Sequence, residues 1–184
     1  FPTRRSSDLI YTSKNEKPKE FTEEQKNKAT YAYQLLNNWK TIPGKKNDDS
    51  FDGIALKKWL EEVKLSCTQS GHLEVALIHI GKVLVYSPAD PTGLWIHKDA
   101  ATLLDEKNED AKEMRSGFRT ELFNKRGAFY YTKGEDEKRL ENEYKQKAEA
   151  VEKEGYIRLA TTLRSIADSY KRDAEREALR NPFE

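Results

Sequence analysis

The apolar residues of this chain are concentrated in one stretch near its middle, residues 72–95 (HLEVALIHIGKVLVYSPADPTGLW). Leu73, Leu77, Ile80 and Leu84 fall at helical spacing there, and the positions between them are also largely apolar. A helix that is apolar on all sides must be enclosed by other elements, so we expect residues 73–86 to form a buried central helix. The β-branched residues keep a buried strand open as the alternative, because periodicity alone does not separate the two in a short apolar run.

A rigid turn follows this stretch and ends at Trp95. Pro88 and Pro91 each fix the backbone φ angle, so the turn has few conformations to lose on folding. We expect the tryptophan to fold back as a plug on the end of the central helix, against Leu84 or Val85, with its N–H bonded. The alternative is an exposed tryptophan that anchors a partner.

Two amphipathic helices are predicted before the central one. Thr22 and Gln25 form a capping-box signature for the first. In this helix Tyr31, Leu35 and Trp39 fall one turn apart on an apolar face, with Ala32 and Leu36 beside them. The second begins after a capping aspartate, Asp52, and its apolar face contains Leu56, Trp59, Leu60, Val63 and Cys67. The polar segment GKKNDDS between them is predicted to be a loop.

Helical periodicity predicts four further helices, at about residues 97–106, 109–125, 135–153 and 156–179. The last two are joined at Gly155, and such a tight link favours a long antiparallel hairpin over about residues 135–179. We therefore expect an all-α fold of about seven helices. It would be a single domain over residues 21–180, with core helices in 21–126 and the hairpin in 135–180.

The composition agrees with a helix-rich globular protein, and it also argues against several classes of partner and site. Of the 184 residues, 35% are charged and 36% hydrophobic, and the net charge is +1. A balanced charge gives no general attraction to nucleic acid or anionic membranes. One cysteine excludes an internal disulfide. Since no apolar run is long enough for a bilayer and no leader is visible, we expect a cytoplasmic protein without a membrane partner.

Residues 1–20 are predicted to lie outside the fold. The opening FPTRRSSDL resembles a translation of sequencing-adapter DNA, which implies that residues 1–9 are an artefact and that genuine sequence starts near Ile10. A processed or tagged terminus is the alternative. Residues 10–20 are polar and lysine-rich, as in a linker. We therefore expect a fragment whose upstream part is missing.

Three segments resemble a known kind of module. The runs IGKVLVYSPADPTGLW (Ile80–Trp95), GFRTELFNKRG and RSIADSYKRDAE are similar to the C-terminal all-helical module of some long, uncharacterised bacterial proteins. The resemblance covers about residues 25–178. It implies a C-terminal piece of a larger bacterial protein, and it implies no activity, cofactor or site residue.

Motifs for catalysis, cofactors or metals are not found. The segment GHLEVALIHIGK fails as a phosphate-binding loop, because Ala76 and Val83 stand where a glycine and a hydroxyl residue are required. The three histidines lack metal-ligand spacing, and His79 is best explained as a core histidine. Cys67 lies on an apolar helix face, which favours a buried, inert thiol. We predict no catalytic, cofactor or metal residues and no enzyme, although a site shared with missing upstream domains would be invisible here.

Arginines supply the remaining candidates for a contact. Arg126 ends a helix just before Gly127, where plain C-capping competes with an anion or partner contact. On the last helix, the ~100° step per residue aligns Arg158, Arg172, Arg176 and Arg180. A basic stripe could meet phosphates, but residues 135–184 contain more acidic than basic residues. We expect a non-enzymatic interaction module with a protein partner, and the alternative is a nucleic-acid-binding module that uses these five arginines.

Overall fold

The computed structural model describes residues 22–46, 48, 50–127 and 132–179. This part of the chain contains seven helices and no strand, apart from one isolated antiparallel bridge between Lys45 and Phe51. The helices are α1 (Glu23–Asn38), α2 (Gly53–Gln69), α3 (Leu73–Leu84), α4 (Lys98–Asp105), α5 (Glu109–Asn124), α6 (Glu135–Lys153) and α7 (Ile157–Leu179). The predicted all-α class and the C-terminal hairpin are confirmed.

Local capping explains where several helices begin. The Thr22 hydroxyl accepts from the N–H of Gln25, and the Gln25 side chain accepts in return from the N–H of Thr22, which completes the predicted capping box. The Asp52 carboxylate accepts from two backbone N–H groups in the first turn of α2. Side chains of His97 and Asn108 accept similar bonds at α4 and α5. Each of these caps satisfies donors that a helix start leaves unpaired.

Helix α3 is buried and crosses α5 at very close range. Its buried residues include Leu77, Ile80 and Leu84, so a helix and not a strand occupies this apolar run. A Cβ atom added at Gly81 would lie 1.9 Å from the Met114 carbonyl oxygen of α5. One added at Gly117 of α5 would lie 1.8 Å from the carbonyl oxygen of Ile78. The two glycines thus allow the backbones to meet directly.

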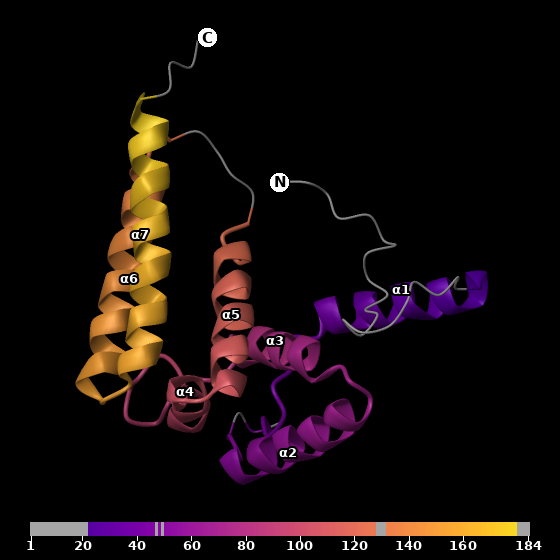
Figure 1. Cartoon of the computed structure of the whole chain (residues 1–184). Coiled ribbons are helices and arrows are strands. Elements are labelled where there is room, and N and C mark those ends of the chain that lie inside the picture. The colour runs from indigo at the N-terminus through magenta and orange to yellow at the C-terminus, as the bar shows by residue number, and fades with distance from the viewer. Residues whose placement is uncertain (1–21, 47, 49, 128–131, 180–184) are drawn as a thin grey trace.

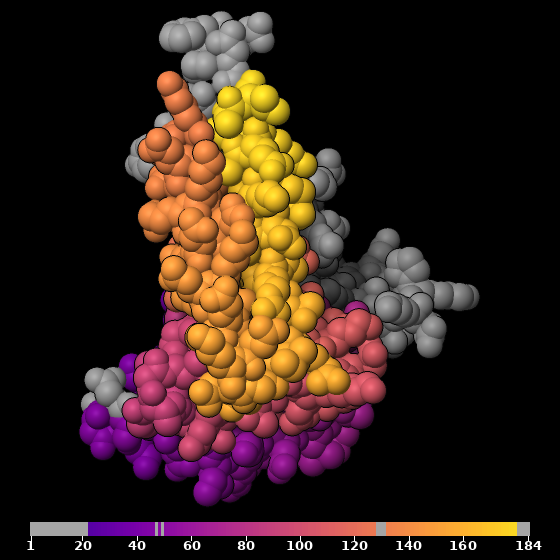
Figure 2. Space-filling model, turned by 90° about the vertical axis from the view of Figure 1, so that its left-hand side faces the viewer, coloured from indigo at the N-terminus to yellow at the C-terminus, as the bar shows by residue number. Residues whose placement is uncertain are grey.

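The hairpin of α6 and α7 stands upright beside α5 (Figure 1) and rises from the remaining helices as a column (Figure 2). Its core contains a stack of rings in which Tyr170 lies between Phe123 and Tyr144, at centroid distances of 5.2 and 5.7 Å. The Tyr144 hydroxyl donates to the Leu122 carbonyl of α5. Stacking and this hydrogen bond fix α5 against the hairpin.

A side chain from α4 caps the first turn of α7. The Asp105 carboxylate accepts from the backbone N–H groups of Arg158 (2.6 Å) and Leu159 (2.9 Å). These donors belong to the start of α7, where the helix itself offers them no acceptor. The hairpin is therefore joined to the lower helices by a tertiary cap as well as by apolar packing.

Trp95 is half-buried, and it lies between α5 and α6. Its ring lies near Phe118, at a centroid distance of 6.5 Å, and its N–H donates to the Lys147 carbonyl oxygen at 3.4 Å. The Lys147 ammonium lies 5.2 Å from the ring centroid. The bonded N–H agrees with the predicted plug, and Trp95 packs against the core cluster that contains Leu84 and Val85.

The predicted central helix is two residues shorter than expected, since α3 ends at Leu84 and Val85 is its C-cap. It packs on α5 and α2, whereas the hairpin packs on α4 and α5. The expectations for residues 1–20 fall outside the described residues.

Candidate functional site

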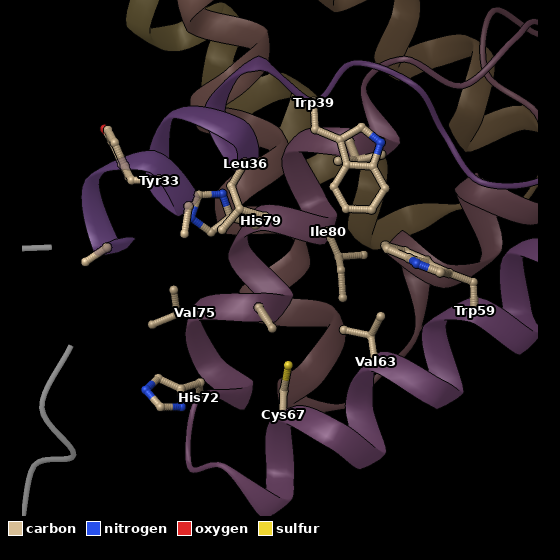
Figure 3. Close-up of a pocket in the computed structure, with 14 residues that line it drawn as sticks. Tyr33, Leu36, Trp39, Trp59, Val63, Cys67, His72, Val75, His79 and Ile80 are labelled. Carbon is tan, nitrogen blue, oxygen red and sulfur yellow. The ribbon is translucent and has the colours of Figure 1, made fainter. Parts of the chain in front are cut away.

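A largely apolar cavity lies between α1, α2 and α3 (Figure 3). Its volume is about 350 Å³, which falls in the range of ~300–1,000 Å³ typical of small-molecule sites. Its lining residues are Ala29, Ala32, Tyr33, Leu36, Trp39, Trp59, Val63, Cys67, His72, Val75, Ala76, His79, Ile80 and Val83.

Helical spacing places these side chains on three facing surfaces. Trp59, Val63 and Cys67 of α2 follow each other every four residues, so they form one wall. Helix α3 turns Gly81 toward α5, and a different side of it, with Val75 and His79, forms the second wall. Trp39, just after α1, contacts Trp59 edge to face at a centroid distance of 5.6 Å. Aromatic rings therefore close one end of the cavity.

His79 is the exceptional residue of the lining. Only 9% of it is exposed, and its Nδ1 atom is buried without a hydrogen-bond partner. Burial, reinforced by the nearby charge of Lys82, lowers the pKa of His79 to about 4, so the imidazole is neutral at pH 7. A buried polar atom without a partner costs about 1–3 kcal/mol. The prediction of a core histidine is confirmed, since His79 is buried, and its Nδ1 atom has no hydrogen-bond partner there.

Cys67 differs from its prediction in a similar way. It is a free cysteine on the apolar face of α2, as expected, but it is only partly buried. In Figure 3 its sulfur points from α2 into the cavity. The thiol is therefore a lining group that a reagent entering the cavity would meet.

The outward side of α1 exposes large apolar side chains. Tyr31 is 70% exposed and Leu35 72%, and none of the sixteen residues of α1 is buried. The predicted apolar face of Tyr31, Leu35 and Trp39 is therefore divided: Trp39 packs on Trp59, while Tyr31 and Leu35 stay exposed. The positions that line the cavity include Tyr33 and Leu36, so α1 presents apolar residues on two sides. In Figure 1 it extends away from the hairpin.

Arg126 is partly buried and forms an ion pair within the fold. Its guanidinium contacts the carboxylate of Glu137, which is fully buried, and lies 5.6 Å from the ring centroid of Tyr170. Burial, with a contribution from the neighbouring carboxyl of Glu177, raises the pKa of Glu137. Gly127 has a φ of +79°, as the predicted left-handed cap requires. Since only 16% of the Arg126 side chain is exposed, it is poorly placed for a phosphate.

A second carboxylate completes this buried polar group. Glu177 of α7 accepts from the backbone N–H groups of Thr132 and Gly134, at the start of α6. The Tyr170 hydroxyl and one oxygen of Glu137 are buried without a hydrogen-bond partner. Glu177 is 6% exposed, so neither carboxyl is open to a substrate. The group ties the two ends of the hairpin together.

The arginine stripe of α7 is occupied by local partners. Arg158 is 3.9 Å from the Asp105 carboxylate, Arg176 is 3.6 Å from that of Asp173, and Arg172 donates to the Ser169 hydroxyl. Arg180 lies outside the described residues. Arg126 does not share an exposed face with these arginines, because it pairs with Glu137 inside the fold.

Sequence reasoning singled out the arginines and did not find the cavity. The available signals were Cys67 and His79, each a polar group on an otherwise apolar helix face. Neither shows that α1 leaves a gap above α2 and α3, because periodicity describes one helix at a time.

Among the described residues, no group of His, Cys, Asp and Glu side chains could hold a metal ion, and no helix combines the length and apolar character needed to cross a bilayer. Comparisons of the chain with protein-family models, with curated proteins and with solved structures each gave no match.

Proposed function

We propose that this chain is a non-enzymatic interaction module, and that the outward side of α1 binds an amphipathic helix of another protein. The observation that carries the proposal is the exposure of Tyr31 and Leu35 on a helix without a single buried residue. Large apolar side chains that gather on a surface mark interaction sites. Here they occupy positions i and i+4, as in the ridge that one helix offers to another.

Helix α1 also gains little stability from the rest of the fold. A helix of sixteen residues is marginal on its own. Its capping box adds about 1 kcal/mol, and its Glu23–Lys26 and Glu24–Lys28 ion pairs add only a few tenths of a kcal/mol each. Burying the Leu35 side chain alone under a partner would stabilise α1 by roughly 1.5–3 kcal/mol. A partner helix would supply this burial.

The charges of α1 favour an apolar partner surface over a charged one. Its first two turns contain two glutamates and two lysines, and these pair with one another. Such a helix neither attracts a polyanion nor selects a strongly charged protein. Shape and apolar contact at Tyr31 and Leu35 would then determine the partner.

Nucleic-acid binding through the arginine face is the alternative, and it has less support. Arg126 is paired inside the fold, while Arg158 and Arg176 have carboxylate neighbours. We also keep the expectation of a cytoplasmic location, with which the free thiol of Cys67 agrees.

The test is selection of helical peptides from a displayed library, followed by binding measurements in solution. The wild-type chain should select amphipathic peptides, and a Tyr31→Ser/Leu35→Ser variant should bind them at least tenfold more weakly. The matched control is Leu65→Ser, since Leu65 is also strongly exposed but lies on α2. This control should bind like the wild type.

Two results would overturn the proposal. One is equal binding of the selected peptides by the double variant. The other is steeply salt-dependent binding of a labelled duplex or single strand that is lost in Arg172→Glu/Arg176→Glu and kept in the α1 variant, which would favour the nucleic-acid alternative.

A further inference from the structure

The cavity beneath α1 is separate from the outward face just described, and it has features of a ligand site. It is bounded by three helices, and three aromatic side chains line it: Tyr33, Trp39 and Trp59. Small-molecule sites combine such an apolar lining with a few polar groups that orient the ligand. The question is therefore whether a suitable polar group is present.

His79 is that group. It lines the cavity, is nine-tenths buried, and keeps Nδ1 without a hydrogen-bond partner. Buried polar atoms in native proteins almost always have a partner. A water molecule is a poor candidate, because a buried water needs two to four polar partners and the lining is mostly apolar. A larger molecule would meet the imidazole with one polar atom and the apolar walls with the remainder.

The other polar side chains of the lining do not compete for this role. In Figure 3 the hydroxyl of Tyr33 points outward, away from the cavity, and His72 is exposed at the start of α3. The Cys67 thiol is only a weak hydrogen-bonding group. His79 Nδ1 is thus a buried polar atom of the lining that has no partner, and the ligand should carry one group that matches it.

The protonation state of His79 restricts that group further. Because burial holds its pKa at about 4, the ring is neutral and offers one donor and one acceptor. A neutral hydroxyl or carbonyl group matches either nitrogen without bringing an unpaired charge into an apolar space.

We propose that the cavity between α1, α2 and α3 binds a small, mainly apolar molecule with one hydroxyl or carbonyl group, and that His79 hydrogen-bonds this group. The inference does not depend on the proposed partner of α1, since it rests on the inward side of that helix.

The experiment compares 1-octanol with 1-chlorooctane, which has the same chain and lacks the hydroxyl. Tryptophan fluorescence reports occupancy, because Trp39 and Trp59 line the cavity. The rate at which a thiol reagent modifies Cys67 gives a second readout. We expect a saturable emission change and slower modification of Cys67 with 1-octanol, and binding about three- to tenfold weaker for 1-chlorooctane, the effect of one hydrogen bond.

Two variants locate the site. His79→Leu should bind both probes alike, and Ala76→Phe, which fills the cavity, should bind neither. Circular dichroism of each variant confirms its helix content. Leu65→Ala on the exposed side of α2 is the control and should match the wild type.

The proposal fails if neither probe changes the emission or the Cys67 rate of the wild-type chain up to its solubility limit. It also fails if His79→Leu, folded, keeps the preference for the alcohol, because another group would then receive the hydroxyl.

Discussion

Replacing Gly81 by alanine is the most direct test of the contact between α3 and α5. The new Cβ atom would lie 1.9 Å from the Met114 carbonyl oxygen, 2.7 Å from its carbonyl carbon and 2.9 Å from its Cα. These are backbone atoms, which cannot rotate away as the end of a flexible side chain can. The helices must therefore move apart.

Two opposing effects set the magnitude. Alanine in place of glycine inside a helix ordinarily adds about 1 kcal/mol of stability. Against this, restoring an ordinary contact of 3.4 Å from 1.9 Å requires a separation of about 1.5 Å (3.4 − 1.9). A gap of even 0.5–1 Å loses a quarter to a half of the dispersion attraction across an interface, and overpacking costs typically 1–3 kcal/mol or more. Because the whole α3–α5 contact opens, we expect a net loss of about 3 kcal/mol.

The assay is denaturant unfolding followed by circular dichroism, with a thermal melt beside it. A loss of about 3 kcal/mol corresponds to a fall in Tm of roughly 6–12 °C for a chain of this size. Ser116→Ala, on the exposed side of α5, is the control and should stay within about 0.5 kcal/mol.

A second glycine gives an independent check. Gly117→Ala should lower the free energy of unfolding as much as Gly81→Ala does. The double variant should lose less than the sum of the two single losses, because the first separation of the helices already makes room for the second Cβ. If Gly81→Ala were as stable as the wild type, the close crossing of α3 and α5 would be refuted.

Four further variants test other parts of the structure. Asp105→Ala removes the cap of α7 and should lower the free energy of unfolding by about 1–2 kcal/mol, measured by urea titration. Arg126→Ala leaves the carboxylate of Glu137 buried and unpaired, and should cost about 3–5 kcal/mol in the same assay; a loss below 1 kcal/mol would contradict a buried pair. The pKa of His79 lies at about 4 in the folded chain and near 6.5 when unfolded. Protons therefore favour the unfolded chain as the pH falls from 7 to 4, and the wild type should lose about 3 kcal/mol more than His79→Leu over that range. Trp95→Ala should lower the free energy of unfolding by about 2–3 kcal/mol, less than the loss at a fully buried tryptophan. An unchanged Tm together with loss of a binding partner would instead favour the alternative that Trp95 anchors a partner.

Much of the fold could be predicted because it depends on local patterns. The capping box at Thr22, the cap at Asp52 and the left-handed Gly127 each involve residues within a few positions of one another. Apolar periodicity likewise located all seven helices of the described chain, since it directly reports the side of a helix that can be buried.

Predictions failed where two distant segments had to be matched. Helix α1 has apolar residues at helical spacing on two sides, and the sequence does not say that Tyr33 and Leu36 face inward while Tyr31 and Leu35 stay exposed. The spacing of the arginines along α7 likewise does not show the acceptors that lie beside Arg158, Arg172 and Arg176.

The same limit applies to the candidate site. Glu137 was one acid among many in the sequence, and nothing local connects it with Arg126. The cavity arises from an incomplete fit among three helices, which is a property of their packing and not of any one of them.

The cap that Asp105 places on α7 limits how the chain can be divided. The α6–α7 hairpin resembles an independent unit in Figure 1, and Glu177 even supplies acceptors for the start of α6 from within the hairpin. The opposite end is not self-sufficient, because the first donors of α7 are accepted by a residue 53 positions earlier. A hairpin excised from residue 132 onward would fray where α7 begins, whereas a piece that starts before α4 would keep both ends closed.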